Sequence, residues 1–343
     1  MILHNKFDKQ TLRKFLESED YERKTLSFYR YVKIENPAEF RDFLYNRLSA
    51  INVLGRIYVA NEGVNGQISL PADKQEDLKT FFESMPGFEN LRLNFAVEDK
   101  KDSFLKLKIK VRKKIVADGL NDETFDVTSK GVHLDAAGFN KLTDEENTVL
   151  IDMRNHYESE IGHFEKAICP DVDTFRDSLP IIADMLEDKK DKKIVMYCTG
   201  GIRCEKASAW LKHKGFEKVY QLDGGIIEYA RQVKESGLKN KFIGKNFVFD
   251  ERLGERIGNE IISECHQCGA PCDTHTNCAN DACHLLFIQC ENCAQKYNAC
   301  CSSECSDFIQ LPLEVQKEKR KGIMKGRQVY KKGRIRPKIN SKD

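Results

Sequence analysis

The segment KKIVMYCTGGIRCEKASAWLKHKG, residues 192–215, predicts a strand, a tight turn and a helix in direct succession. The β-branched, apolar run before Cys198 is typical of a buried parallel strand. The run that follows the turn has a helical composition and stops at Gly215. Similar strands and helices alternate over residues 146–238, which indicates an α/β fold with a parallel sheet. Ligands of such sheets bind at the carboxyl ends of the strands, so Cys198 lies where this fold class carries its chemistry.

The loop after Cys198 has the residues of an anion-holding turn. Gly200 and Gly201 allow backbone N–H groups to converge on the cysteine sulfur, and the start of the helix adds positive potential. These features lower a thiol pKa, and Arg203 can bind an anion held above the sulfur. We predict two catalytic residues, Cys198 and Arg203, and an anion-holding loop of Thr199, Gly200, Gly201 and Ile202. Cys204 is either a resolving thiol or a space-filling residue.

The length of this loop separates two classes of cysteine enzyme. Cysteine phosphatases place five residues between cysteine and arginine, whereas four residues separate Cys198 from Arg203. The shorter loop resembles that of the rhodaneses, whose cysteine carries a persulfide. Residues 150–170, LIDMRNHYESEIGHFEKAICP, resemble the rhodanese entry motif, and residues 215–225, GFEKVYQLDGG, resemble the closing motif. Tyr229 is a departure, because rhodaneses usually carry tryptophan there.

The residues before this module predict a separate domain. Residues 25–97 read as strand, helix, strand, strand, helix and strand, the order of a ferredoxin-like α+β sandwich, with NEGVNG (61–66) as the turn of a hairpin. The expected divisions are residues 1–120 for this domain, 121–145 for a connector with a helix capped by Asp135, 146–238 for the parallel α/β rhodanese domain, 239–310 for a small cysteine-rich metal-binding segment, and 311–343 for a basic, mobile tail.

Thirteen cysteines are present, and ten of them lie between Cys265 and Cys305. Two CxxC pairs in this segment are a strong signal for metal-binding thiolates. The eight best candidates are Cys265, Cys268, Cys278, Cys283, Cys290, Cys293, Cys301 and Cys305, and spacing does not divide them between ions. Structural zinc is the main interpretation, with an iron–sulfur cluster or metal-free reduced cysteines as alternatives. So small and polar a segment needs a metal to fold.

Positive charge gathers at two places although the formal net charge is only +2. Residues 314–343 are strongly basic, and a basic stripe of Lys106, Lys108, Lys110 and Arg112 alternates with apolar residues along 105–112. The stripe either follows a nucleic-acid backbone or protects an edge strand from aggregation. The chain shows no apolar run of about 18 residues and no signal peptide. We therefore expect a cytoplasmic protein with an acidic partner and no membrane.

The three-part order resembles the oxygen-dependent tRNA uridine hydroxylases. Its most specific parts are NEGVNG (61–66), YCTGGIRCEKAS (197–208) and NCANDACHLLFIQC (277–290). The resemblance implies hydroxylation of carbon 5 of the wobble uridine, tRNA as partner, molecular oxygen as co-substrate and Cys198 as an essential thiol or persulfide. No flavin or NAD fingerprint is seen, and the pair His133 and Asp135 matches only part of an iron-binding triad. The alternative is a persulfide-carrying sulfurtransferase that acts on a small molecule, a protein or RNA.

Overall fold

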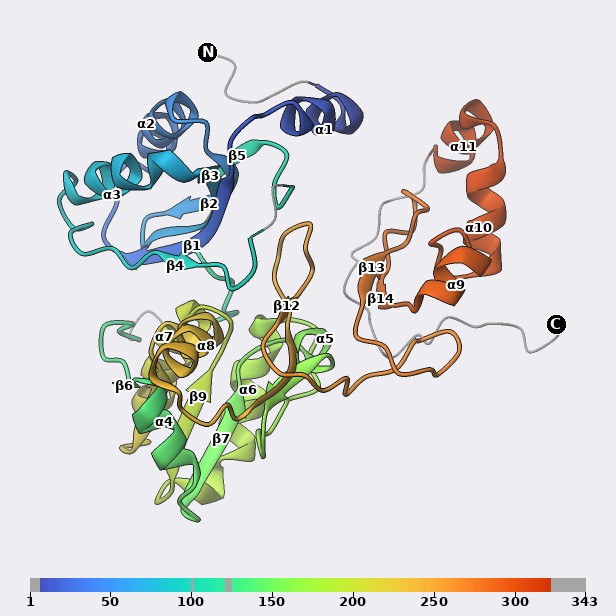
Figure 1. The fold of residues 1–343 in the computed structure, drawn as a ribbon. Coiled ribbons are helices and arrows are strands. Elements are labelled where there is room, and N and C mark those ends of the chain that lie inside the picture. Colours follow the sequence, from blue (N-terminus) through green and yellow to red (C-terminus); the bar gives the residue numbers. More distant parts are fainter. Residues whose placement is uncertain (1–6, 100–101, 121–124, 322–343) are drawn as a thin grey trace.

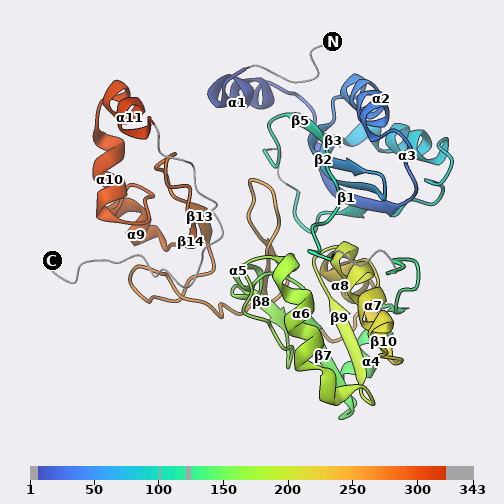
Figure 2. The same cartoon turned by 180° about the vertical axis from the view of Figure 1, so that it is seen from behind.

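The computed structural model describes residues 7–99, 102–120 and 125–321. Figure 1 shows three parts: an N-terminal sandwich, a central α/β part, and a cysteine-rich part that carries the last helices. Seen from behind in Figure 2, the sandwich again lies over one end of the central part. Within the described ranges, no helix has both the length and the apolar content needed to cross a membrane.

The N-terminal part confirms the predicted ferredoxin-like sandwich. Its sheet has the strand order β4-β1-β3-β2-β5, and the first four strands in this order pair antiparallel. Helices α2 and α3 pack against one face and bury apolar residues such as Leu44, Leu48, Leu78 and Phe82. The elements are α1 (Lys9–Glu17), β1 (Arg23–Tyr31), α2 (Pro37–Ala50), β2 (Leu54–Ala60), β3 (Gly63–Pro71), η1 (Ala72–Lys74), α3 (Gln75–Glu83), β4 (Asn94–Phe95) and β5 (Leu107–Val111).

The hairpin of this domain differs from the sequence-based expectation. The hairpin turn is shorter than NEGVNG, because Gly63 already pairs with Ala60 and begins β3. A Cβ at Gly63, where φ is +140°, would lie 1.9 Å from the carbonyl oxygen of Arg30, so only glycine allows the strands to approach here. Phe43 on α2 is 44% exposed and its ring contacts that of Phe81.

The central part confirms the predicted rhodanese-like parallel sheet, with the strand order β6-β10-β9-β7. Residues 132–143, which we placed in the connector, supply β6 and α4 to this part, and the Asp135 side chain caps α4 as predicted. The Tyr229 hydroxyl donates to Asn140 Oδ1 at 2.9 Å, which gives the substituted tyrosine a buried partner. The elements are β6 (Val132–Leu134), α4 (Ala136–Thr143), β7 (Thr148–Asp152), α5 (His156–Ser159), β8 (Gly162–Phe164), α6 (Phe175–Met185), η2 (Glu187–Lys189), β9 (Lys193–Tyr197), α7 (Ile202–His213), β10 (Val219–Leu222) and α8 (Gly225–Ser236).

The C-terminal part starts from the central part through a small sheet of order β12-β11-β8. Beyond it, β13 and β14 form a hairpin beside three short helices. The elements are β11 (Phe242–Asn246), β12 (Glu255–Arg256), β13 (His275–Asn277), β14 (Leu286–Ile288), α9 (Glu291–Lys296), α10 (Ser303–Gln310) and α11 (Leu313–Arg320). The start of the expected mobile tail is therefore helical, because α11 continues to Arg320. Residues 322–343, with most of the predicted basic tail, lie outside the described residues.

A buried ion cluster fixes the sandwich to the central part. The Lys206 ammonium, 2% exposed, donates to Glu62 at 2.9 Å and to Asp118 at 2.6 Å. Glu62 belongs to NEGVNG and Lys206 to YCTGGIRCEKAS, so two of the three quoted motifs meet here. Removing one partner of such a buried pair leaves an uncompensated charge and costs about 3–5 kcal/mol. The cluster therefore holds the Cys198 loop at a fixed distance from the sheet.

Candidate active site and metal centres

Cys198 lies between the end of β9 and the start of α7, as the sequence predicts. Its side chain is buried, and the Gly201 N–H donates to Sγ at 3.1 Å. Gly201 has a φ of +101°, and a Cβ there would lie 2.8 Å from the Tyr29 hydroxyl oxygen. Glycine is thus required both by the backbone conformation and by the close approach of β1.

The surroundings of the Cys198 sulfur favour its anionic form. Burial raises the pKa of Cys198, but a hydrogen bond from the Cys204 thiol, the charge of Arg203 and nearby backbone N–H groups outweigh it and lower the pKa from 9.0 to about 6. Burial and the neighbouring Cys198 raise the pKa of Cys204 well above its ordinary value. Near neutral pH the pair therefore consists of a Cys198 thiolate and a Cys204 thiol that donates to it.

We expect Cys198 to titrate with a midpoint near pH 6. Thiolates absorb in the ultraviolet, so the difference in absorbance between the wild type and Cys198→Ser at each pH isolates the ionisation of Cys198 from that of the other cysteines. Because the folded-state pKa is depressed, the thiolate stabilises the fold above the unfolded-state pKa, and this contribution is lost as the pH falls through about 6. A midpoint near the ordinary value of 9.0 would contradict the assigned environment.

The Arg203 guanidinium is paired with a buried carboxylate, a partner that the sequence did not predict. Its two terminal nitrogens donate to the two carboxylate oxygens of Glu158 at 2.6 and 2.8 Å, and one also donates to Thr199 Oγ1 at 3.2 Å. Glu158 is fully buried in α5 and also accepts from the Asn155 backbone N–H. The guanidinium is therefore engaged by a bidentate ion pair. It fixes the loop and contributes positive charge near Cys198.

The rest of the loop is held by the first turn of α8 and by the sandwich. The backbone N–H groups of Ile226 and Ile227 donate to the carbonyls of Cys198 and Thr199 at 3.0 and 3.3 Å. The Gly200 carbonyl accepts from the Asn94 side chain at 3.4 Å. A weaker contact of 3.5 Å joins the Tyr31 hydroxyl to the carbonyl of Ile202, where α7 begins. Both domains thus position the predicted loop.

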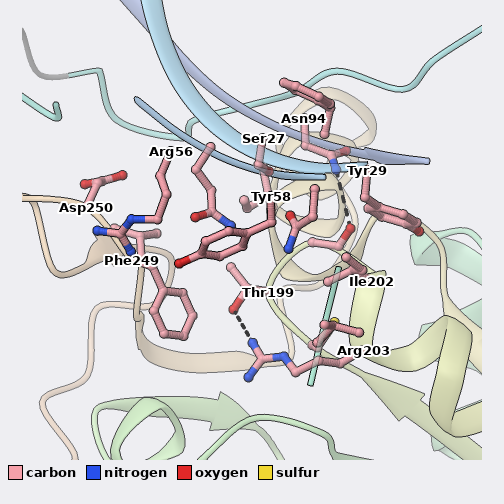
Figure 3. A pocket seen from close by; sticks show the side chains of 18 of the residues that line it. Ser27, Tyr29, Arg56, Tyr58, Asn94, Thr199, Ile202, Arg203, Phe249 and Asp250 are labelled. Atoms are coloured by element: carbon pink, nitrogen blue, oxygen red, sulfur yellow. Dashed lines mark hydrogen bonds between the residues drawn. The ribbon is translucent and has the colours of Figure 1, made fainter. Parts of the chain in front are cut away.

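A cavity of about 370 Å³, the interdomain cavity, lies between the loop and the sheet. The sheet contributes Ser27, Tyr58, Gln67 and Asn94, the loop contributes Cys198 and Thr199, and the C-terminal segment contributes Phe249. Figure 3 shows Ser27 and Tyr58 on the sheet side of the cavity and Thr199 and Arg203 on the opposite side, while Arg56 extends toward Asp250 and Phe249. The volume of the interdomain cavity lies within the usual range for small-ligand pockets, about 300–1,000 Å³.

The basic stripe lies on the face of the sheet that forms this cavity. In the register of β2 and β5, Lys108 is opposite Arg56 and Lys110 is opposite Tyr58. Lys106, Lys108 and Arg112 are exposed and Lys110 is half-buried, while Leu107 and Ile109 pack into the core. The Arg112 guanidinium carbon lies 5.5 Å from the centre of the Tyr58 ring. β5 is also an edge strand in the described sheet, so the position of the stripe fits both nucleic-acid binding and protection of an edge from aggregation.

The cysteine-rich part gathers all eight predicted metal ligands into two groups. Within each group, the four Sγ atoms all lie within 4.8 Å of one another. The groups are Cys265, Cys268, Cys290 and Cys293, and Cys278, Cys283, Cys301 and Cys305. This division, which spacing left open, interleaves the two groups along the chain. Cys272 and Cys300 belong to neither group among the described residues.

The geometry of each group fits a single tetrahedral ion. Four thiolates at the usual zinc–sulfur distance of about 2.3 Å lie roughly 3.8 Å apart. Cys268 and Cys290 are separated by 3.6 Å, Cys283 and Cys301 by 3.6 Å, and Cys301 and Cys305 by 3.9 Å, from sulfur to sulfur. Backbone N–H groups also donate to Cys265 and Cys278, as expected for ligating thiolates. Four thiolates complete the shell, so each ion would be structural.

Comparisons with known proteins agree with this three-part arrangement. Residues 23–115 match the UPF0176 acylphosphatase-like domain, residues 135–232 match the rhodanese-like domain, and residues 243–306 match the rhodanase C-terminal domain. A tRNA uridine(34) hydroxylase from Leptospira interrogans is 56% identical over 338 residues, which cover 98% of this chain and 92% of the relative. The chain belongs to the tRNA uridine(34) hydroxylase family. A relative of the same name from Enterobacter sp. is 53% identical over 99% of this chain and 97% of its own length. Another from Erwinia tasmaniensis is 53% identical over 97% of this chain and 95% of its own length.

Two residues near Cys198, Glu158 and Asn94, were not predicted from the sequence. Glu158 carried a signal, because it stands in the stretch that resembles the rhodanese entry motif, but its partner Arg203 lies 45 residues away. Asn94 carried none, because nothing in the sequence places β4 against the Cys198 loop. The interdomain cavity could not be predicted either, since it needs residues from all three parts of the chain.

Proposed function

We propose that the protein hydroxylates carbon 5 of uridine 34, the wobble uridine of tRNA, with molecular oxygen as the oxidant. The observation that carries the proposal is 53–56% identity, over nearly the whole chain, to relatives named tRNA uridine(34) hydroxylase. The reaction inserts one oxygen atom into the C5–H bond. The other atom leaves as water after two electrons and two protons are supplied by a reductant. We place the reaction in the cytoplasm, where tRNA decodes mRNA.

The position of a wobble base in tRNA makes it easy to present to the cavity beside Cys198. A wobble base belongs to the anticodon loop and is already unpaired, so presenting it to an enzyme requires little energy. The basic stripe leads along the sheet face to the interdomain cavity, and its cations suit the phosphates on either side of an inserted base. In this proposal Lys106, Lys108, Lys110 and Arg112 bind the RNA backbone.

The roles of the loop residues follow from their contacts. Cys198 is the essential thiolate, or the carrier of a persulfide, at one wall of the cavity. The Gly201 N–H and the Cys204 thiol stabilise its charge, and Arg203 with Glu158 keeps the loop in place. We propose zinc in both cysteine groups, with a structural role. In this assignment the zinc ions stabilise the C-terminal part, which also places Phe249 at the wall of the cavity.

Nucleoside analysis of tRNA tests the function. In a strain that lacks the gene, 5-hydroxyuridine and its derivatives should disappear, and a plasmid copy should restore them in aerated but not in oxygen-free culture. Mass spectrometry of digested tRNA measures both. An unchanged nucleoside profile in a strain without a second hydroxylation pathway would refute the proposal.

Binding of the purified protein to tRNA, measured at several salt concentrations, tests the basic stripe. A variant with Lys106→Gln, Lys108→Gln and Lys110→Gln should bind tRNA more weakly, with a flatter dependence of affinity on salt. Full affinity in this variant would assign the stripe to edge protection alone.

A second candidate, persulfide transfer, is favoured by the loop itself. The four-residue spacing and the lowered pKa of Cys198 suit a sulfur carrier as well as a hydroxylase. A sulfurtransferase would form thiocyanate from thiosulfate and cyanide, and its deletion would change thionucleosides or acceptor sulfur instead of hydroxylated uridine. Thiocyanate formation without any change in hydroxyuridine would favour this second function.

A further inference from the structure

We propose that a second cavity, next to the interdomain cavity, binds a nucleotide adjacent to uridine 34, and that Arg56 binds the phosphate between the two nucleotides. The inference rests on the proposed function and deepens it, because it names a second RNA subsite and a residue that positions the target nucleotide.

The second cavity has a volume of about 410 Å³ and adjoins the interdomain cavity. Both cavities are lined by Arg56, Phe249 and Asp250, so they meet at these three residues. Further walls of the second cavity come from β5 with the residues before it, and from the loop between β11 and β12, which reaches toward the sandwich (Figure 1). A ligand that extends past Arg56 can therefore occupy both cavities.

The cations that line the second cavity have no carboxylate partner. Arg56, Lys106 and Lys108 are exposed, and the side chain of each forms no ion pair within the described ranges. The charges of Lys108, Arg112 and Arg56 lower the pKa of Lys110, after burial as the main cause, so these cations lie close enough to repel one another. Protection of an edge does not explain Arg56, because β2 is paired on both sides. A bound anion would relieve the repulsion.

The carboxylates of the second cavity, in contrast, have cationic partners. Asp250 accepts two hydrogen bonds from the Arg252 guanidinium, at 2.8 and 2.5 Å. Glu251 forms an ion pair of 3.9 Å with Arg13. The charge that remains for a ligand is therefore positive, which suits a phosphate.

The spacing along the sheet fits consecutive nucleotides. Arg56 and Tyr58 are two positions apart on β2, and Lys108 and Lys110 are opposite them on β5. Side chains at alternate positions of a strand are about 6.7 Å apart, which is close to the distance between successive phosphates of an extended RNA strand. Tyr58 lines the interdomain cavity, whereas Arg56 lines both cavities. One step of the RNA strand therefore leads from the first cavity to the second.

The walls of the second cavity also offer surfaces for a base. Phe104 and Leu105 line it from the sandwich, and Phe249 lines it from the C-terminal part. The Phe249 ring centre lies 5.8 Å from the Arg203 guanidinium carbon, so this wall is connected to the Cys198 loop. Aromatic rings stack on any base. We therefore expect the second cavity to require the presence of a base and not one particular base.

Binding of labelled anticodon stem-loop RNAs to the full-length protein, measured by fluorescence anisotropy, tests the inference. One RNA is complete, and the others lack the base before uridine 34, the base after it, or a base at a distant loop position. Loss of one of the two adjacent bases should weaken binding about 10-fold or more. Loss of the distant base should change the affinity little.

Two variants assign this effect to the second cavity. Leu105→Trp would fill the cavity, so it should weaken binding of the complete RNA and remove the sensitivity to the adjacent base. Arg56→Gln should weaken binding and reduce the slope of log affinity against log salt by roughly 0.7, as expected for one lost phosphate contact. Lys79→Gln is the matched control, because it removes an exposed cation from α3, on the other face of the sheet, and should change neither quantity.

Two results would overturn the inference. Equal affinity for the complete RNA and for both RNAs that lack an adjacent base, or continued sensitivity in Leu105→Trp, would show that the second cavity holds no base. A wild-type salt slope in Arg56→Gln would remove the phosphate contact. All of these measurements are of binding, so a protein that binds as expected but leaves uridine 34 unmodified would overturn the proposed reaction and not this subsite.

Discussion

Cys198→Ser is expected to reduce hydroxylation of uridine 34 to less than about one thousandth of the wild-type rate. The two side chains have nearly the same size, so the loop and its Gly201 contact can persist. The change acts through ionisation: the Cys198 pKa of about 6 gives a thiolate near neutral pH, whereas a serine hydroxyl stays neutral. Nucleoside mass spectrometry with the variant as the only copy of the gene measures the loss.

Cys204→Ser is the matched control for this prediction. It makes the same replacement of sulfur by oxygen in a neighbouring buried side chain, and a serine hydroxyl still donates to the Cys198 sulfur. If Cys204 is only a donor, the variant retains most of its activity. If Cys204 is a resolving thiol, its loss is comparable to that of Cys198→Ser. Near-normal hydroxylation by Cys198→Ser itself would mean that the loop is vestigial and that the chemistry lies elsewhere.

Local patterns explain which parts of the fold could be predicted from the sequence. The strand, turn and helix around Cys198 follow from a β-branched run, two glycines and a helical segment that ends at Gly215, which has a φ of +88°. The stripe on β5 follows from strict alternation, and Asp135 caps its helix as the local sequence indicates. Each of these depends on residues a few positions apart, where sequence spacing fixes the geometry.

The unpredicted features depend on contacts between distant segments. The ion pair of Arg203 and Glu158 could not be predicted, because only the placement of α5 beside α7 brings the two residues together. The contact of Asn94 with the Gly200 carbonyl depends on β4, an edge strand of the sandwich, lying against the loop. The order of the cysteines likewise does not reveal the interleaved groups, because the β13–β14 hairpin brings Cys265 and Cys290 together.

The second large effect is expected from the metal centres. The purified protein should contain two zinc ions per chain, and Cys265→Ser and Cys278→Ser should each remove one of them. Each change replaces a thiolate by a neutral hydroxyl and opens a tetrahedral site. Elemental analysis by mass spectrometry counts the ions. Two equivalents of iron, or inorganic sulfide, would replace the zinc assignment by iron chemistry.

Chelation of both ions should unfold the cysteine-rich part, because structural zinc contributes about 10–16 kcal/mol to small domains of this kind. Its two apolar cores are small, and cysteines make up more than half of one and a third of the other. Limited proteolysis should then cleave within residues 263–306, while the central sheet, with its separate core, resists. Cys272→Ser and Cys300→Ser are the matched controls, since these cysteines lie outside both groups and their loss should leave two zinc ions bound. A metal-free protein that resists protease as well as the loaded one would show that the cysteines stabilise this part without metal.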